Sequence, residues 1–242
     1  MFSKIKNISV VTAMLFSSAV SADTLLVPDA IFDGTSDKLI TGKAVLVKNG
    51  KIARIADKGS FSGNTATVIE LTGQTLMPGL IELHSHVLLH PYDEVSWNDQ
   101  VLKETYAERA IRAANHLKSS LHAGYTTLRD LGSEGAEYLD VGVRNTLRKG
   151  VIEGPRLLVA GKAIVATGSY GPKGFGEHVT VPLGAEEGDG GDLIRITRDQ
   201  IGHGADFIKV YADYRWGPNG EAMPTFSIDE IKTIVETAQS SG

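Results

Sequence analysis

The sequence predicts an α/β protein: a partial TIM-type (β/α)8 barrel, comprising the first four βα units, preceded by a small N-terminal β-sandwich module. Three observations lead to this prediction. Residues 24–75 show strand patterns separated by turns, residues 80–242 alternate apolar runs with stretches of helical period, and polar residues follow the apolar runs. The alternation favours a parallel sheet. A small open doubly wound sheet is the alternative, but polar residues at the strand ends favour the barrel.

Composition excludes several classes of protein. The chain has 242 residues, enough for one large domain or two small ones. Its formal net charge is -5, and no run of Lys and Arg occurs, which argues against a general nucleic-acid binder. The absence of cysteine rules out disulfides, thiolate catalysis and zinc–cysteine sites.

The first 22 residues are predicted to be a signal peptide. Lys4 and Lys6 form a positive segment, residues 8–20 form an apolar one, and Val20-Ser-Ala22 supplies the small residues of a cleavage site. We therefore expect export, in a bacterium to the periplasm, and no membrane attachment after cleavage; a retained N-terminal anchor is the alternative. The expected domains are residues 1–22 as signal peptide, 23–78 as the N-terminal part of a composite β-sandwich, and 79–242 as the first half of a barrel.

Strands of the N-terminal module are predicted from short apolar runs that end at turns. Asn49-Gly50 separates two of them, and this pair favours a two-residue hairpin because both turn positions take positive φ. Gly73 closes the last run. The predicted strands are Leu25–Val27, Ala44–Val47, Ile52–Ile55 and Thr67–Leu71.

The second part alternates strands with helices. Ser227 and Glu230 have the spacing of a capping box before the last helix. Residues 167–192 are rich in Gly and acidic residues, show no period, and are predicted to form a long loop. The predicted strands are residues 80–86, 125–131, 155–160 and 206–211, and the predicted helices are residues 107–121, 137–149, 193–201 and 228–238.

Two histidines and a lysine carry the predicted chemistry. His84 and His86 end a short apolar run that is typical of a buried strand. Residues i and i+2 of a strand share a face, so both imidazoles are expected to point the same way. Neutral imidazole is a preferred zinc ligand. A surface His-x-His without a metal is the alternative. Lys209 lies in an apolar strand, where a buried lysine is costly; a lysine that reaches the rim or pairs with a carboxylate is the alternative.

Three segments resemble the amidohydrolase superfamily, near its imidazolonepropionase-like and prolidase-like members. They are residues 77–86 (MPGLIELHSH), 123–132 (AGYTTLRDLG) and 204–211 (GADFIKVY). The resemblance implies that Lys209 is carboxylated by carbon dioxide and bridges two divalent metal ions, with zinc as the expected metal and His84 and His86 as further ligands. It implies hydrolysis of a C–N bond in a dipeptide or cyclic amide by metal-activated water.

The chain also departs from the family pattern. The family's two later histidines and its aspartate, which acts as ligand and general acid/base, have no counterpart here, so we expect an incomplete fragment. Residues 167–171 read TGSYG where many prolidase-like relatives have TGGHG, which puts a dipeptide substrate in doubt. The alternatives are a lactonase or esterase on the same metals, and a non-catalytic periplasmic binding or scaffold protein. The expected partner is a small-molecule or dipeptide substrate, and a homo-oligomer is left open.

Weaker candidates follow the same strands. Arg129 and Asp130 are expected to form an ion pair that fixes a strand end. Four residues are weak substrate-binding candidates: His90, Tyr92, Tyr211 and Tyr214. His178 is expected to be exposed in the long loop, and three further histidines are expected to be structural: His116, His122 and His203.

Overall fold

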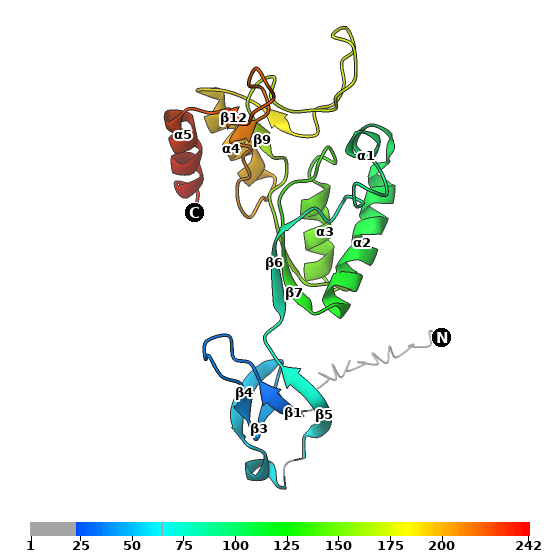
Figure 1. Ribbon diagram of the computed structural model, residues 1–242, viewed down its shortest axis with the longest axis vertical. Helices are drawn as coiled ribbons and strands as arrows, with labels where there is room; N and C mark the ends of the chain where they lie inside the picture. Colours follow the sequence, from blue (N-terminus) through cyan, green and yellow to red (C-terminus); the bar gives the residue numbers. More distant parts are fainter. Residues whose placement is uncertain (1–22, 64) are drawn as a thin grey trace, which may run out of the picture. The chain divides into compact units, whose positions relative to one another are not determined.

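A computed structural model of the chain describes residues 23–63 and 65–242 (Figure 1). These residues form two compact units, which divide between Pro78 and Gly79. The predicted signal peptide, residues 1–22, lies outside the described residues, so export stays a prediction. Within the described part of the chain, none of the helices combines the length and the apolar character that crossing a membrane requires.

The first unit is built on one five-stranded sheet, in which β1 pairs antiparallel with β2 and β3 and parallel with β5. The β3–β4 hairpin turns at Asn49 and Gly50, with φ of 50° and 70°, which confirms the predicted turn. The described residues of this unit show a single sheet, and the β-sandwich stays a prediction. The elements are β1 (Thr24–Ile31), β2 (Ile40–Thr41), β3 (Lys43–Lys48), β4 (Lys51–Asp57), the 3-10 helix η1 (Lys58–Phe61) and β5 (Thr67–Leu76).

The second unit begins with three parallel strands in the order β6-β7-β8. Helices α2 and α3 pack along this sheet (Figure 1) and bury apolar residues that include Leu117, Leu128 and Val159. The predicted alternation of strands and helices is therefore present here. The elements are β6 (Leu80–Ser85), α1 (Trp97–Lys103), α2 (Tyr106–His122), β7 (Tyr125–Asp130), α3 (Leu139–Arg148) and β8 (Arg156–Val159).

The second unit continues with short strands and two helices. Helices α4 and α5 pack together around a second apolar cluster that includes Ile196 and Ile234. Ser227 and Glu230 form the predicted capping box at the start of α5. The elements are β9 (Ile164–Val165), β10 (Glu186–Glu187), α4 (Asp192–Gly202), β11 (Asp213–Tyr214), β12 (Met223–Pro224) and α5 (Ile228–Gln239).

The predicted strand at residues 206–211 is wrong as a continuous strand. Only Val210 forms a bridge there, to Ile164. The segment nevertheless runs beside the chain that follows β8. The Asp206 N–H donates to the Val159 carbonyl at 2.8 Å, and the Lys209 carbonyl accepts from the Ile164 N–H at 2.9 Å. Backbone hydrogen bonds at Asp206 and at Lys209, without a continuous strand ladder, therefore hold Lys209 in position.

The prediction that the apolar run of β6 is buried is also wrong. Leu80, Ile81 and Leu83 are 40%, 61% and 57% exposed. The reason lies in the sheet: among residues 23–63 and 65–242, β6 is hydrogen-bonded only to β7, on one of its edges. A strand with one neighbour cannot bury side chains as a central strand does.

Candidate metal centre

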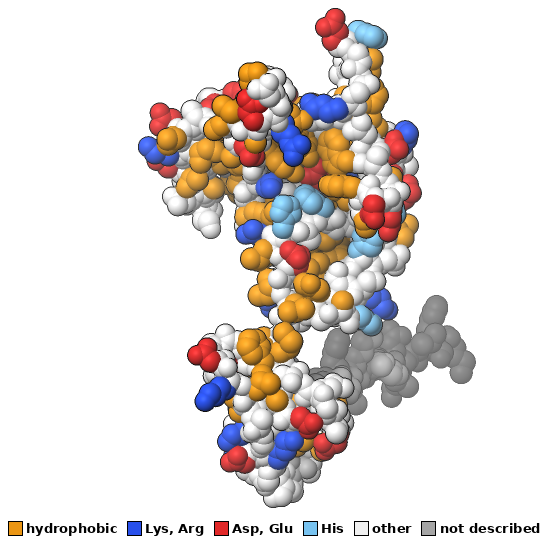
Figure 2. Space-filling model, viewed as in Figure 1, with side chains coloured by type: hydrophobic (Ala, Val, Ile, Leu, Met, Phe, Trp, Pro, Cys, Tyr) orange, Lys and Arg blue, Asp and Glu red, His pale blue; other side chains and the backbone are white. Residues whose placement is uncertain are grey.

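His84 and His86 lie at the carboxyl end of β6. Their ring centroids are 5.5 Å apart, and the ring planes make an angle of 65°. Figure 2 shows histidine side chains grouped among hydrophobic ones on one face of the second unit. Partial burial, then the positive charges of His86 and Lys209, lower the pKa of His84. The neutral imidazole, which is the form that binds a metal, is therefore favoured at His84.

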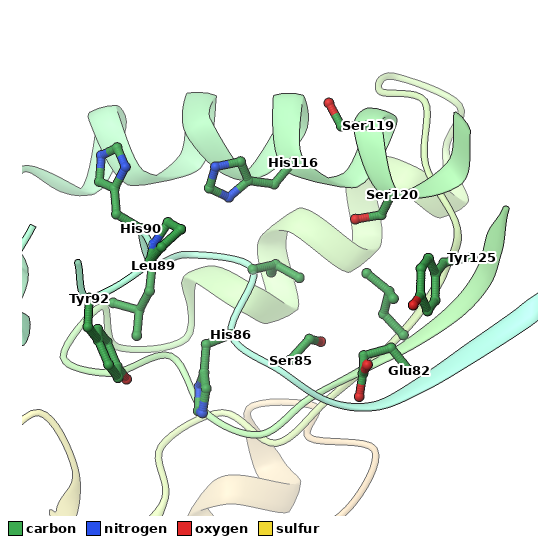
Figure 3. A pocket seen from close by; sticks show the side chains of 13 residues that line it. Glu82, Ser85, His86, Leu89, His90, Tyr92, His116, Ser119, Ser120 and Tyr125 are labelled. Atoms are coloured by element: carbon green, nitrogen blue, oxygen red, sulfur yellow. The ribbon is translucent and has the colours of Figure 1, made fainter. Parts of the chain in front are cut away.

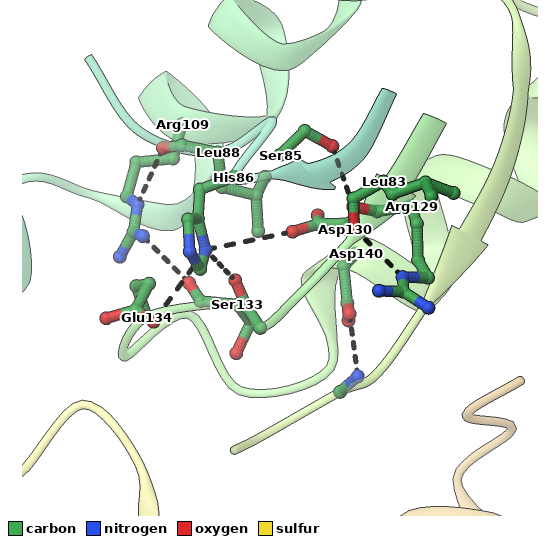
Figure 4. Close-up of polar contacts among 12 residues, drawn as sticks. Leu83, Ser85, His86, Leu88, Arg109, Arg129, Asp130, Ser133, Glu134 and Asp140 are labelled. Atoms are coloured by element: carbon green, nitrogen blue, oxygen red, sulfur yellow. Dashed lines mark hydrogen bonds and ion pairs between the residues drawn. The ribbon is translucent and has the colours of Figure 1, made fainter. Parts of the chain in front are cut away.

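His86 is held by its Nδ1 atom (Figure 4). This nitrogen lies 3.1 Å from the Gly132 carbonyl oxygen, with carboxylate oxygens of Glu134 and Asp130 at 3.7 and 4.0 Å. Because a carbonyl only accepts, Nδ1 carries the proton in this contact. Nε2 then keeps a free lone pair. A histidine that donates its other N–H to a carbonyl or carboxylate is the usual arrangement of a metal ligand.

Asp130 is a fully buried carboxyl group beside His86 (Figure 4). Its contacts are the backbone N–H groups of Gly132 and Val87, which act to lower its pKa, and His86 Nδ1 at 4.0 Å. Burial, and next the negative charge of Asp140, raise the pKa of Asp130 well above its ordinary value. The expected ion pair with Arg129 is wrong. Arg129 Nε instead donates to the Leu83 carbonyl at 2.9 Å, because consecutive strand residues point to opposite faces.

Lys209 lies half-buried in the extended segment after α4. Its Nζ atom is 4.5 Å from the centroid of the Tyr211 ring. Burial is the largest cause that lowers the pKa of Lys209, and the positive charge of Arg129 lowers it further, against the opposite effect of Glu134. The charge of Lys209 in turn acts on His84. The lysine and the histidines therefore belong to one electrostatic neighbourhood.

These groups fit a divalent metal in part. Two imidazoles, an amine of lowered pKa and a buried carboxyl lie in the same part of the second unit. A cluster of three or more His, Asp or Glu side chains close enough to hold a metal ion does not occur among residues 23–63 and 65–242. The assignment of His84, His86 and Lys209 as metal ligands therefore stays a prediction.

Glu134 was not among the candidate residues predicted from the sequence. Its carboxylate is 2% exposed, and it accepts hydrogen bonds from Trp97 Nε1 at 2.8 Å, the Tyr170 hydroxyl at 2.8 Å and the Tyr211 hydroxyl at 3.2 Å. Burial, followed by the charge of Glu134, raises the pKa of Tyr170 and of Tyr211. Both phenols therefore stay protonated and donate. Among its partners, Tyr211 was a weak substrate-binding candidate, and Tyr170 lies in the TGSYG segment at residues 167–171.

A cavity of about 600 Å³ lies beside β6 and α2 (Figure 3). His86 and Tyr92 lie on one side of it, and His90 and His116 lie on the other. His116 was expected to be structural, but it faces this cavity, with its ring centroid 6.3 Å from that of His90. Two of the four weak substrate-binding candidates therefore line a cavity next to His86.

The other two weak candidates lie near Tyr170. The Tyr211 ring stacks on the Tyr170 ring at 4.7 Å, and the Tyr214 ring lies edge-on to it at 6.4 Å. Of the remaining histidines, His122 and His203 contact other side chains and His178 is exposed. His122 pairs with Glu153 at 2.8 Å, His203 stacks on Tyr138 at 3.8 Å, and His178 is exposed as expected.

Comparisons with curated proteins find distant relatives of part of the chain. A dihydroorotase of Elusimicrobium minutum (strain Pei191) is 28% identical over 103 residues, which cover 43% of this chain and 20% of the relative. An adenine deaminase of Chelativorans sp. (strain BNC1) is 29% identical over 66 residues, which cover 25% of this chain and 11% of the relative.

Solved structures match over nearly the whole chain. A crystal structure of an amidohydrolase has a TM-score of 0.74 at 30% identity, covering 91% of this chain and 54% of its own. A prolidase complexed with N-methylphosphonate-L-proline has a TM-score of 0.75 at 27% identity. The match covers 90% of this chain and 54% of the prolidase chain. The chain thus spans about half the length of these proteins, and its mixed α/β fold is consistent with part of a TIM-type barrel.

Sequence comparison with protein families gives the same result. Residues 75–242 match the model of the amidohydrolase family. The matched range includes β6 with its histidines and the segment with Lys209. Members of this family generally use divalent metal ions. The chain belongs to the amidohydrolase family.

Proposed function

We propose that the protein acts as a metal-dependent hydrolase of a C–N bond, with His84, His86 and Lys209 among its metal ligands. One observation carries the proposal: His86 Nδ1 contacts the Gly132 carbonyl at 3.1 Å, which leaves Nε2 free beside the neutral ring of His84. A ring fixed in this tautomer is prepared to bind a metal without further ordering.

Each residue has a distinct role in this proposal. His84 and His86 donate neutral ring nitrogens, and Lys209 reacts through its uncharged amine, which burial favours. The amine nitrogen adds to the carbon of carbon dioxide and releases one proton, giving a carbamate that is an anionic oxygen ligand. When bound, divalent metal ions polarise the substrate carbonyl and make hydroxide available near neutral pH.

The proposed substrate is a dipeptide or a cyclic amide. The similar prolidase structure, complexed with N-methylphosphonate-L-proline, supports the dipeptide. The similar dihydroorotase supports a cyclic amide. Tyr170 argues against the dipeptide. Its hydroxyl donates to buried Glu134 and is therefore not free to bind the carboxylate of a dipeptide.

The test measures zinc and activity in the full-length protein. We expect His84→Ala, His86→Ala and Lys209→Ala to lower the bound zinc measured by mass spectrometry of metals, and to remove hydrolysis of a panel of dipeptides and cyclic amides. His122→Ala is the matched control, because that histidine pairs with Glu153 on the surface. Zinc content that is equal in all four variants would refute the ligand assignment.

A further inference from the structure

Glu134 connects four separate segments of the chain. Its carboxylate accepts from Trp97 in α1, from Tyr170 in the long loop and from Tyr211, two residues after Lys209. It also lies 3.7 Å from His86 Nδ1, as Figure 4 shows. The loop, α1 and the lysine segment therefore meet the histidine strand at one buried side chain.

The backbone at Glu134 adopts a conformation that non-glycine residues rarely take. Its φ is 50°, in the left-handed region that glycine adopts most readily. Glu137, in the same turn, has the same φ of 50°. The carboxylate of Glu137 differs in its surroundings, since it pairs with Lys162 at 2.6 Å and its side chain is 56% exposed. The two residues share residue type and backbone conformation and differ only in what the carboxylate contacts.

We propose that Glu134 is a positioning residue, which holds the Tyr170 loop and the Lys209 segment against the histidine strand and orients the His86 ring for metal binding. The orientation of His86 rests on the proposed function, whereas the contacts to Trp97 and the two tyrosines do not. A carboxylate suits the task because it accepts several donors at once on two oxygens. Its Oε1 atom lies 3.7 Å from His86 Nδ1, on the same side of the ring as the Gly132 carbonyl that Nδ1 contacts.

Glutamine at this position separates charge from shape. The amide of Glu134→Gln keeps one accepting oxygen and replaces the other with an NH₂ group. If the oxygen stays with Trp97 and Tyr170, Tyr211 must accept from the NH₂ group instead of donating, and the negative charge beside His86 Nδ1 is lost. Tyr170→Phe keeps the stacked ring and removes a single donor. Glu137→Gln is the matched control on the same turn.

The first measurement needs no metal. The chain has two tryptophans, so a ¹⁵N-labelled full-length protein gives two indole N–H resonances, and Trp216→Phe assigns them. We expect the Trp97 resonance to move in Glu134→Gln and in Tyr170→Phe, because Trp97 and Tyr170 share one carboxylate oxygen. Glu137→Gln should leave it in place.

The second measurement is zinc affinity by competition with a chelator. Glu134→Gln removes the charge beside His86 Nδ1 and leaves its contact with the Gly132 carbonyl in place. Loss of a partner behind a metal-binding histidine typically weakens binding about 10- to 100-fold, so we expect a loss at the low end, about 10-fold, in Glu134→Gln and none in Glu137→Gln. Equal affinities in these two variants, or an unmoved Trp97 resonance, would overturn the inference. Failure of the unaltered protein to bind zinc would refute the proposed function as well, and a shifted Trp97 resonance would then show that only the metal-related part had failed.

Discussion

Arg144 offers the sharpest test of how the lysine segment is held. Its Nη1 atom donates to Asp206 Oδ2 at 2.7 Å and to the Gly204 carbonyl at 2.7 Å, and its side chain is 7% exposed. Asp206 Oδ2 also accepts from the Val159 N–H at 3.0 Å. This ion pair therefore fastens the start of the segment that leads to Lys209.

Replacement of Arg144 by methionine keeps the apolar stem and removes the charge. Breaking a buried pair by removing one partner typically costs about 3–5 kcal/mol. The Asp206 side chain is 22% exposed, and water can partly replace its lost partner. We therefore expect the free energy of unfolding to fall by about 3 kcal/mol, at the low end of that range.

Arg148 provides a control on the same carboxylate. It contacts Asp206 Oδ1 at 3.4 Å, but its side chain is 59% exposed. Exposed pairs contribute about 0–1 kcal/mol, so Arg148→Met should fall in that range. Urea denaturation followed by circular dichroism measures both variants, and hydrogen exchange should show faster opening of residues 206–211 in Arg144→Met. Equal loss of stability in the two variants would refute the reasoning.

Three further predictions concern stability. Since burial raises the pKa of Asp130 above 3.8, the folded protein keeps a proton that the unfolded chain releases, so stability falls as pH rises from about 4. The pKa of buried Asp140 is raised as well, so Asp130→Asn should reduce this fall without abolishing it in metal-free protein, at about 1.4 kcal/mol per unit of raised pKa that is removed. A pH profile parallel to that of the unaltered protein would contradict this. Gly79→Ala should destabilise by about 1–3 kcal/mol, because the new Cβ would lie 2.6 Å from Thr126 Cβ, which no side-chain rotation can relieve; thermal denaturation measures it. Ser227→Ala should cost about 1 kcal/mol through loss of the cap of α5, whereas Ser227→Asp should retain most of the stability in the same assay.

Features that depend on neighbours in sequence were predictable. The Asn49-Gly50 turn and the capping box of Ser227 and Glu230 involve only a few consecutive residues, and both are present. Helices α2 and α5 form where the apolar period predicts them, although Ile111 and Ile228 of that period are 68% and 76% exposed. Helix α1 was missed, because it has only seven residues and its stability depends on Gln100, whose buried side chain bonds to the carbonyls of His90 and Val95.

Features that depend on distant residues were not predictable in the same way. Residues 206–211 have the composition of a strand, but a ladder needs a continuous partner strand. This segment has only separate contacts, to Val159 at one end and to Ile164 at the other. The expected Arg129–Asp130 pair fails for a reason already present in the strand pattern, since neighbours along a strand point to opposite faces. Glu134 is bonded to residues 37, 36 and 77 positions away, and no local pattern marks such a residue.

The histidine pair shows how the two kinds of information combine. The prediction assumed a regular strand, yet the β6–β7 register shifts between Glu82 and Ser85, and the His84 N–H bonds to the Glu82 carboxylate at 2.8 Å instead of the ladder. Irregular strand ends of this kind redirect side chains near functional sites. The Ser85 hydroxyl, which donates to the Arg129 carbonyl at 3.0 Å, fastens the strand end after the shift. The alternation of His84 and His86 thus indicates which residues meet, while side-chain hydrogen bonds from β6 to itself and to β7 decide how their rings are held.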